Sequence, residues 1–351
     1  MNRFAFLLGA WYNKVVIPQT LHQQLHERAV SMSNTKMSRS IFLAAVAVFL
    51  AGAISTGCGK SEDPDFKEQH TVNAAEQAKD EAEFRVYLQA AEQGSAEAQY
   101  RLGLLYSYGR GVKQSLEESA KWLEKAAEQG HVKAQVHLAI FCYESGFGVP
   151  QSYGKAAKWL KKAAEQGDAF AQYNYASHCE NGKGVKKDLE EAVAWYRKAA
   201  EQDQNDAQVS LGKCLYRGIG VKQDFEEAEV WLRKAAESHR PEAQTLLGNM
   251  YQNGEGLPKD DEQAVYWYRK AADWGDSEAQ YRLALYLLDG IGVPKNTAEA
   301  IRLLRVTAEK RYPGAKDKLK ELADKGDTQA QKAFKEVEAE HKKEGVSFGW
   351  R

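Results

Sequence analysis

Apolar side chains from about residue 82 onward recur at helical spacing, in blocks separated by glycine-rich stretches. One type of block opens with an Ala-Gln pair and carries a large apolar or aromatic residue four positions after the alanine. Another apolar residue follows near the next turn, and this i, i+4, i+8 spacing gives a helix with one apolar stripe. The six pairs, each with its large residue, are Ala98-Gln99 with Leu102, Ala134-Gln135 with Leu138, Ala171-Gln172 with Tyr175, Ala207-Gln208 with Leu211, Ala243-Gln244 with Leu247 and Ala279-Gln280 with Leu283.

A second type of block alternates with the first and predicts a second helix. It carries a tryptophan that is followed four and five positions later by two alanines. Large side chains facing small ones are typical of closely interlocked helices, so we interpret the tryptophans as core residues. They are Trp122, Trp159, Trp195, Trp231 and Trp267, with Leu303 in the sixth block.

The stretch between the two helices has the residues that end one helix and begin the next. Each stretch holds a Gly-x-Gly, and glycine adopts the left-handed conformation that ends helices. Four residues later stands a preferred N-cap residue, and in five of the six units a Glu or Gln three positions further on completes a capping box. The N-cap residues are Ser115, Ser152, Asp188, Asp224, Asp260 and Asn296.

The whole pattern repeats with a period of 36 residues. Ala-Ala-Glu-Gln-Gly occurs at 90–94, 126–130 and 163–167, and variants continue to 271–275. One step is 37 residues long, with the extra residue between Cys142 and Gly146. Such a period predicts about six stacked helix–turn–helix units, an all-α solenoid over residues 74–344 with helical caps at both ends and a short tail at 345–351.

These residues resemble the Sel1-like repeat family, which is related to the tetratricopeptide repeats. The resemblance covers residues 82 to about 326 and departs only locally, where Cys142, Cys179 and Leu215 replace a tyrosine. It implies a right-handed α-solenoid and a non-catalytic scaffold that binds a protein or peptide on the concave face formed by the first helices. Some cysteine-rich members are reported to bind or hydrolyse penicillins, so an enzyme acting on the cell wall or on β-lactams is the alternative.

Candidate binding residues follow from the orientation of the related tetratricopeptide arrays. On that orientation, the exposed positions lie two before the large residue and two, five and six after it. Exposed aromatic residues in a concave patch are typical binding anchors. The alternative is that these rings pack against adjacent helices. The candidates are Tyr100, Leu104, Tyr108, Val136, Ile140, Tyr143 and Tyr173.

The amino-terminal region predicts export. An uncharged apolar run from Ile41 to Ile54 is too short to span a bilayer but suits the core of a signal peptide, here residues 37–57. The run ends just before Cys58, which resembles the lipidated cysteine of bacterial lipoproteins, although Ser55 stands where leucine is usual. Ordinary cleavage near residues 51–53 and a retained anchor are the alternatives.

The expected location is therefore the periplasmic face of the bacterial outer membrane, through a lipid anchor, or else the periplasm or the medium. Residues 58–73 are polar and predict a flexible tether. Residues 1–36 fit no signal-peptide pattern, so we interpret them as lying upstream of the true start or as disordered.

Charge and candidate chemistry narrow the possible functions. Residues 58–351 hold 43 basic and 48 acidic side chains, without the basic surplus that binding to nucleic acid requires. Ser152 and Lys155 match the Ser-x-x-Lys motif of penicillin-recognising enzymes. The companion Ser-Asp-Asn and Lys-Thr-Gly motifs are missing, however, and Ser152 already occupies an N-cap position. The scattered histidines predict no metal site, and no cofactor motif is present. The three remaining cysteines, Cys142, Cys179 and Cys214, predict buried free thiols.

Overall fold

The computed structural model describes residues 64–347, all within helices or the loops that join them. The chain forms two compact units, Met1–Glu81 and Ala82–Arg351, and the helix α4 (Pro64–Glu92) crosses the boundary between them. The predicted signal peptide at 37–57, Cys58 and the first 36 residues lie outside the described residues.

The predicted tether at 58–73 needs a correction, because α4 already begins at Pro64. Proline is favoured in the first turn of a helix, where its missing N–H costs no hydrogen bond. The polar residues that follow, including Lys67 and Glu68, are good helix formers as well as good linker residues. Composition alone therefore misassigned residues 64–73.

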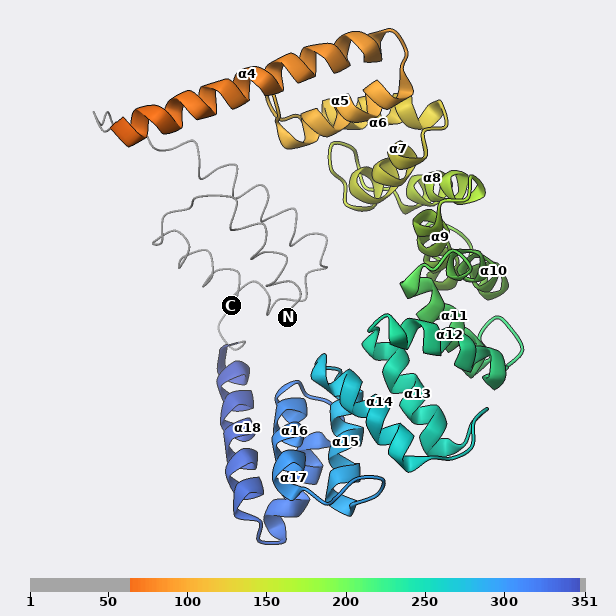
Figure 1. The fold of residues 1–351 in the computed structure, drawn as a ribbon, viewed down its shortest axis with the longest axis vertical. Helices are drawn as coiled ribbons and strands as arrows, with labels where there is room; N and C mark the ends of the chain where they lie inside the picture. The colour runs from red at the N-terminus through yellow and green to blue at the C-terminus, as the bar shows by residue number, and fades with distance from the viewer. Residues whose placement is uncertain (1–63, 348–351) are drawn as a thin grey trace. The chain divides into compact units, whose positions relative to one another are not determined.

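Six helix pairs follow one another along the chain in the second unit (Figure 1). Each pair is one repeat unit, numbered here from one to six. Each helix contacts mainly its partner and the nearest helix of one adjacent unit. The predicted all-α solenoid is confirmed. The pairs are α5 (Ala96–Tyr108) with α6 (Leu116–Glu128), α7 (Val132–His137) and η1 (Leu138–Glu144) with α8 (Tyr153–Glu165), α9 (Ala169–Asn181) with α10 (Leu189–Ala200), α11 (Asn205–Arg217) with α12 (Phe225–Glu237), α13 (Pro241–Asn253) with α14 (Asp261–Asp273), and α15 (Ser277–Asp289) with α16 (Thr297–Glu309).

Close packing within each unit depends on the small residue beside the large one. A Cβ atom added to Gly212 of α11 would lie 2.7 Å from Leu232 of α12, closer than real side chains approach. Leu232, Trp231 and the alanine pair at 235–236 are buried in the core. Large side chains facing small ones therefore allow the close helix packing that was predicted. Three of the five tryptophans are buried in the core as expected, while Trp122 and Trp159 are partly exposed.

The six predicted N-caps are all present, each side chain accepting a hydrogen bond from the backbone N–H three residues later. The predicted capping boxes are not completed, because the N–H of each cap residue donates to a carbonyl of the preceding first helix, as that of Ser115 does to Tyr106 at 3.0 Å. In units three and four the residue in the third position contacts the tryptophan instead. Glu191 and Glu227 accept hydrogen bonds from the indoles of Trp195 and Trp231, one turn further on. The glutamates thus join the cap to the tryptophan layer.

A buried glutamine connects each unit to the preceding helix. The glutamine of every Ala-Gln pair donates its Nε2–H to the carbonyl oxygen of an alanine eight residues earlier, as Gln172 does to Ala164 at 3.2 Å. That carbonyl lies at the end of the preceding second helix, where helical carbonyls lack an intrahelical partner. The equivalent bonds are made by Gln99, Gln135, Gln208, Gln244 and Gln280.

The extra residue of unit two is absorbed by a π-helical segment, η1. A single inserted residue inside an α-helix is commonly accommodated in this way. The register is restored before Tyr143, whose carbonyl accepts the N–H of Ser152 just as the carbonyl of Tyr106 accepts that of Ser115 in unit one. Tyr143 therefore occupies a core position of the repeat.

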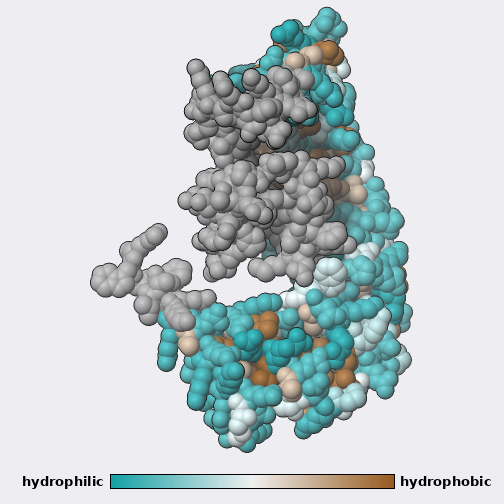
Figure 2. All heavy atoms as spheres, turned by 60° about the vertical axis from the view of Figure 1, so that its left-hand side comes forward, coloured by the Kyte–Doolittle hydropathy of each residue, from teal (hydrophilic) through white to brown (hydrophobic). Residues whose placement is uncertain are grey.

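Two further helices close the array, α17 (Ala315–Asp324) and α18 (Thr328–Ser347), and both contact α16. The predicted terminal cap is confirmed, but α18 runs three residues into the expected tail. On the face shown in Figure 2, hydrophilic residues predominate and hydrophobic ones lie in small areas between them. Within residues 64–347, no helix combines the length and the hydropathy needed to cross a membrane.

Candidate protein-binding surface

The first helices of the units present one continuous face, here called the first-helix face. First helices of consecutive units contact each other directly at α11–α13 and α13–α15, whereas no pair of second helices makes a contact of that extent. In most first helices the outward stripe lies five and one positions before the large residue and two and six after it, although in α13 the residue one before, Leu246, is buried. In α9 this stripe consists of Phe170, Asn174, Ser177 and Asn181.

In units one to three the first-helix face carries exposed aromatic rings. Tyr108 at the end of α5 is 66% exposed, Phe141 in η1 is 47% exposed and Phe170 at the start of α9 is 50% exposed. We call these three residues, one from each of three consecutive units, the aromatic stripe. Single exposed apolar residues are normal, but rings from successive units on one face are a feature of binding surfaces.

A stack of rings lies beneath Phe141, the middle residue of the aromatic stripe. His137 lies against Phe141 with 4.4 Å between ring centroids, and it meets the edge of Tyr100 at 6.5 Å. Tyr100 in turn stacks on His131 at 4.7 Å, and His131 contacts Glu97 through Nε2 at 2.9 Å. Burial lowers the pKa of His137 to about 4, so at neutral pH the stack holds an uncharged imidazole.

The residues predicted from the sequence fall into three groups. Tyr108 is exposed, and Leu104 and Ile140 are half-buried on the first-helix face. Tyr100, Val136 and Tyr173 are half-buried because they pack between neighbouring helices. Tyr143 was placed on this face by counting forward from Leu138, and that placement is wrong. It is 4% exposed, and its hydroxyl donates to Glu124.

Phe141, Phe170 and His137 belong to the surface but were not predicted. The sequence does contain the signal for Phe141. Tyr143 stands three residues before Gly146, as Tyr106 stands three before Gly109, so Tyr143 belongs to the same core position of the repeat. The extra residue of unit two then lies before Tyr143, where Phe141 is an apolar residue without a core position. Phe170 lies in the first turn of α9, ahead of the stripe that periodicity identifies. Its position is polar in the other first helices, for example Glu97 in α5 and Asp206 in α11.

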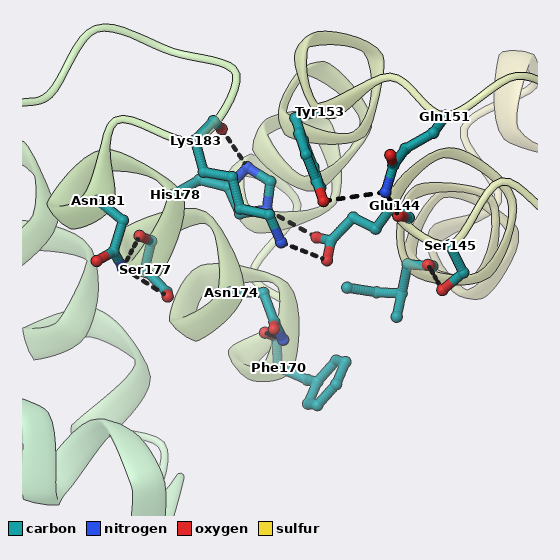
Figure 3. Close-up of polar contacts among 11 residues, drawn as sticks. Glu144, Ser145, Gln151, Tyr153, Phe170, Asn174, Ser177, His178, Asn181 and Lys183 are labelled. Atoms are coloured by element: carbon teal, nitrogen blue, oxygen red, sulfur yellow. Dashed lines mark hydrogen bonds and ion pairs between the residues drawn. The ribbon is translucent and has the colours of Figure 1, made fainter. Parts of the chain in front are cut away.

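A polar junction fixes the end of η1 to α9 beside this surface (Figure 3). Glu144 contacts His178 at 2.7 Å and Lys183 at 3.1 Å, while Nδ1 of His178 faces the carbonyl oxygen of Lys183 at 2.6 Å. Although burial alone would raise the pKa of Glu144, hydrogen bonds from His178 and Lys183 hold it below its ordinary value.

Comparison with known proteins identifies the repeat. The Sel1 repeat matches six consecutive segments, at residues 96–131, 132–168, 169–204, 205–239, 241–276 and 277–312. The chain belongs to the Sel1 repeat family. Proteins built from Sel1 repeats generally serve as scaffolds for protein–protein interaction.

Two solved Sel1 structures resemble this chain. One is c5321, described as a protective antigen of uropathogenic Escherichia coli strains with an SLR fold, at 35% identity and a TM-score of 0.66 over 73% of this chain. The match covers 56% of c5321. The other is a Sel1 repeat protein from Oxalobacter formigenes, at 36% identity and a TM-score of 0.53, covering 61% of this chain and 86% of that one. No curated protein matches.

The Ser-x-x-Lys pair has a structural place in this Sel1 array. Ser152 caps α8 by accepting a hydrogen bond from the N–H of Lys155 at 3.4 Å, and the Lys155 ammonium lies 5.1 Å from the Tyr143 ring centroid. Among the described residues, no group of three or more His, Cys, Asp or Glu side chains could hold a metal ion.

The three cysteines among the described residues, Cys142, Cys179 and Cys214, are buried free thiols, as predicted. Burial raises the pKa of Cys142 to about 12 and that of Cys214 to about 11, and it also raises the pKa of Cys179. A thiol with a raised pKa carries little thiolate at neutral pH and is a poor nucleophile.

Proposed function

We propose that this protein is a non-catalytic scaffold of the cell envelope that binds an extended segment of a partner protein across the first helices of units one to three. The observation that carries the proposal is the aromatic stripe, Tyr108, Phe141 and Phe170. Aromatic rings supply much of the energy in protein interfaces, since each buries a large area with little loss of side-chain freedom.

The chemistry around the stripe fits a peptide rather than a small molecule. The three rings come from three successive units, so an extended chain that crosses these units can meet them one after another. The amides of Asn174 and Asn181 lie on the same face and bond to carbonyls of their own helix. Each amide oxygen can still accept a hydrogen bond from a backbone N–H of the partner.

Site-specific photocrosslinking in intact cells tests the binding surface. A crosslinker placed at position 108, 141 or 170 should capture the same partner, and one at the equally exposed Tyr266 of α14 should not. The variant Phe141→Ser/Phe170→Ser should lose that partner without a change in melting, whereas Tyr266→Ser should keep it. Equal capture at all four positions, or at none, would contradict the proposal.

The proposed location is the periplasmic face of the outer membrane, through lipidation of Cys58. The support is the apolar run at 41–54 followed by this cysteine in the sequence. Cells fed a clickable fatty acid should label the wild-type protein but not Cys58→Ala. A variant that labels as strongly as the wild type would contradict the anchor, and a soluble periplasmic or secreted form would then replace it.

The non-catalytic role is tested separately. Its support is that Ser152 and Lys155 are engaged in capping and in contact with an aromatic ring. We expect no turnover of a reporter β-lactam by the purified protein. Turnover that disappears in Ser152→Ala would favour an enzyme and would overturn this part of the proposal.

A further inference from the structure

The second helix of unit two differs in charge from its five counterparts. Within Tyr153–Glu165, α8 holds four lysines and one glutamate, which is its last residue. By contrast, α6 and α12 each hold four glutamates and two basic residues, and α10, α14 and α16 have no basic surplus. Among the six second helices, α8 is therefore the exception, with more basic than acidic residues.

Three of the four lysines of α8 form one strip with two aromatic rings, while Lys161 pairs with Glu191 of α10 at 3.5 Å. Lys155, Lys158 and Lys162 are exposed and share a helix face through their i, i+3, i+7 spacing. Lys162 lies over the ring of the partly exposed Trp159, 4.3 Å from its centroid. Lys158 has no carboxylate within ion-pair distance among the described residues, whereas Lys121, its counterpart in α6, pairs with Glu118 at 2.6 Å.

The loop of unit three extends this strip past the start of α8. A Cβ atom added to Gly184 would overlap the backbone of Tyr153, which shows how closely the loop lies on the first turn of α8. Lys183, from the same loop, lies over the Tyr153 ring at 4.3 Å from its centroid. The hydroxyl of Tyr153 is held by Gln151 at 2.9 Å (Figure 3).

From this geometry we infer that the basic strip, formed by Lys155, Lys158, Lys162 and Lys183 with Tyr153 and Trp159, binds a carboxylate-rich segment of a protein. The strip is one helix wide and, at 1.5 Å per residue, about 20 Å long. A chain of roughly six extended residues fits that length and brings carboxylates to Lys155, Lys158 and Lys162. Lys183, already paired with Glu144 at 3.1 Å, adds its charge and the covered Tyr153 ring at one end of the strip. This surface is separate from the aromatic stripe, which gives the scaffold a second, chemically different binding face.

The width of the strip favours a peptide over a membrane surface. The neighbouring second helices present carboxylates, with Glu117 and Glu128 on α6 and Glu190 on α10, all exposed. A planar anionic membrane would meet these carboxylates together with the lysines and be repelled by them. A narrow peptide that follows α8 meets the lysines alone.

Fluorescence anisotropy with a labelled glutamate-rich peptide and a neutral peptide of equal length tests the inference. The wild-type protein should bind the acidic peptide, with affinity that falls as salt rises, and the neutral one much more weakly. Lys158→Glu/Lys162→Glu should weaken binding by about tenfold or more, because two attractions become repulsions. Lys158→Arg/Lys162→Arg should retain it.

The matched control is Lys121→Glu/Lys125→Glu, which makes the same change at the same two repeat positions of α6. It should leave binding within about twofold of the wild type. Equal losses in the two glutamate variants, with melting unchanged, would overturn the inference. So would tighter binding to vesicles that contain an anionic phospholipid than to the acidic peptide.

Discussion

Units one to three, the early half of the array, and units four to six, the late half, have the same helix pairs. They differ in the hydrogen bonds made by the side-chain oxygen of the buried glutamine. In the early half, the oxygen of each buried glutamine accepts a hydrogen bond from a second glutamine at the end of the same unit, as Gln172 does from Gln202 at 2.8 Å. The other two pairs are Gln99 with Gln129 and Gln135 with Gln166.

In the late half the second glutamine is missing. Ser238, Trp274 and Lys310 stand at its position, 30 residues after the buried glutamine in each unit. The oxygens of Gln208, Gln244 and Gln280 are accordingly buried without a hydrogen-bond partner among the described residues. An unpaired buried polar atom costs about 1–3 kcal/mol, so the late half bears a cost that the early half avoids.

The two halves also differ in the contacts that their first helices make with each other. In the early half aromatic rings connect α5 to the first helix of unit two, as Tyr100 does with His131 and His137. The polar junction at Glu144 then connects η1 to α9. In the late half polar contacts connect them: Lys213 pairs with Glu242 at 2.7 Å, and Asn249 donates to Glu278 at 3.2 Å. The early half thus combines paired buried glutamines with exposed aromatic rings, whereas the late half combines unpaired glutamine oxygens with polar contacts alone between the first helices named here.

The largest expected effect concerns the seam between the halves, where the loop of unit four meets unit three. Gly220 has φ +67°, and an added Cβ would overlap the carbonyl of Leu189 at the start of α10. Gly220→Ala should therefore destabilise the protein by several kcal/mol, from both the left-handed backbone and the collision. Native-state hydrogen exchange should show the seam opening before either half.

Gly167→Ala separates the cost of the left-handed backbone from the cost of the Cβ collision. Gly167 also has a positive φ, +93°, but an added Cβ would meet nothing within 4 Å. Only the backbone cost of about 1–2 kcal/mol remains there. Similar losses in the two variants would show that the close approach at the seam does not hold the halves together.

The next effect tests the glutamine pairs directly. Gln202→Ala removes the donor to Gln172 and leaves a buried oxygen unpaired, which should cost about 1–2 kcal/mol. Ser238→Ala, at the same position of unit four, should cost close to nothing, because the oxygen of Gln208 has no protein partner to lose. Urea unfolding followed by hydrogen exchange measures both, and equal losses would remove the difference between the halves.

The sequence predicted the features that all six units share and missed the features in which a single unit departs from the others. Periodicity, caps and glycines identified every helix pair, because each depends on local rules applied six times. It failed at α4, where composition could not distinguish a helix from a linker, and at Tyr143, where the extra residue shifted the register. The unpaired oxygen of Gln208 was not predicted either, since it depends on a contact with residue 238 that periodicity does not describe.

A pH effect should distinguish the early half from the late half. His137 has a folded pKa of about 4, lowered by burial from an ordinary value of 6.5. The unfolded chain therefore takes up a proton first, and stability should fall as pH drops from about 6.5 toward 4. The carboxylates of Glu97 and Glu144, whose pKa values are lowered, lose their contribution mainly at lower pH.

The variant His137→Phe keeps a ring between Tyr100 and Phe141 but cannot titrate. It should flatten the loss of stability between pH 6.5 and 4.5, measured by thermal melting. His239→Asn, which removes an exposed histidine of the late half and places there a residue that tolerates its positive φ of 58°, serves as the matched control. An unchanged slope in His137→Phe would show that another group controls this window.

The smallest expected effect, a gain, makes the late half resemble the early one. Ser238 has φ −79° and ψ 19°, close to the φ −80° and ψ 6° of Gln129, so a glutamine at 238 can follow the path that Gln129 takes to Gln99. Ser238→Gln should then donate to the oxygen of Gln208 and stabilise unit four by about 0.5–1.5 kcal/mol. Ser238→Glu has nearly the same shape but offers an acceptor in place of the donor. It should therefore give no gain, because two acceptors would face each other. If both substitutions stabilise the protein equally, the gain comes from packing or helix propensity, and the missing hydrogen bond is not what distinguishes the halves.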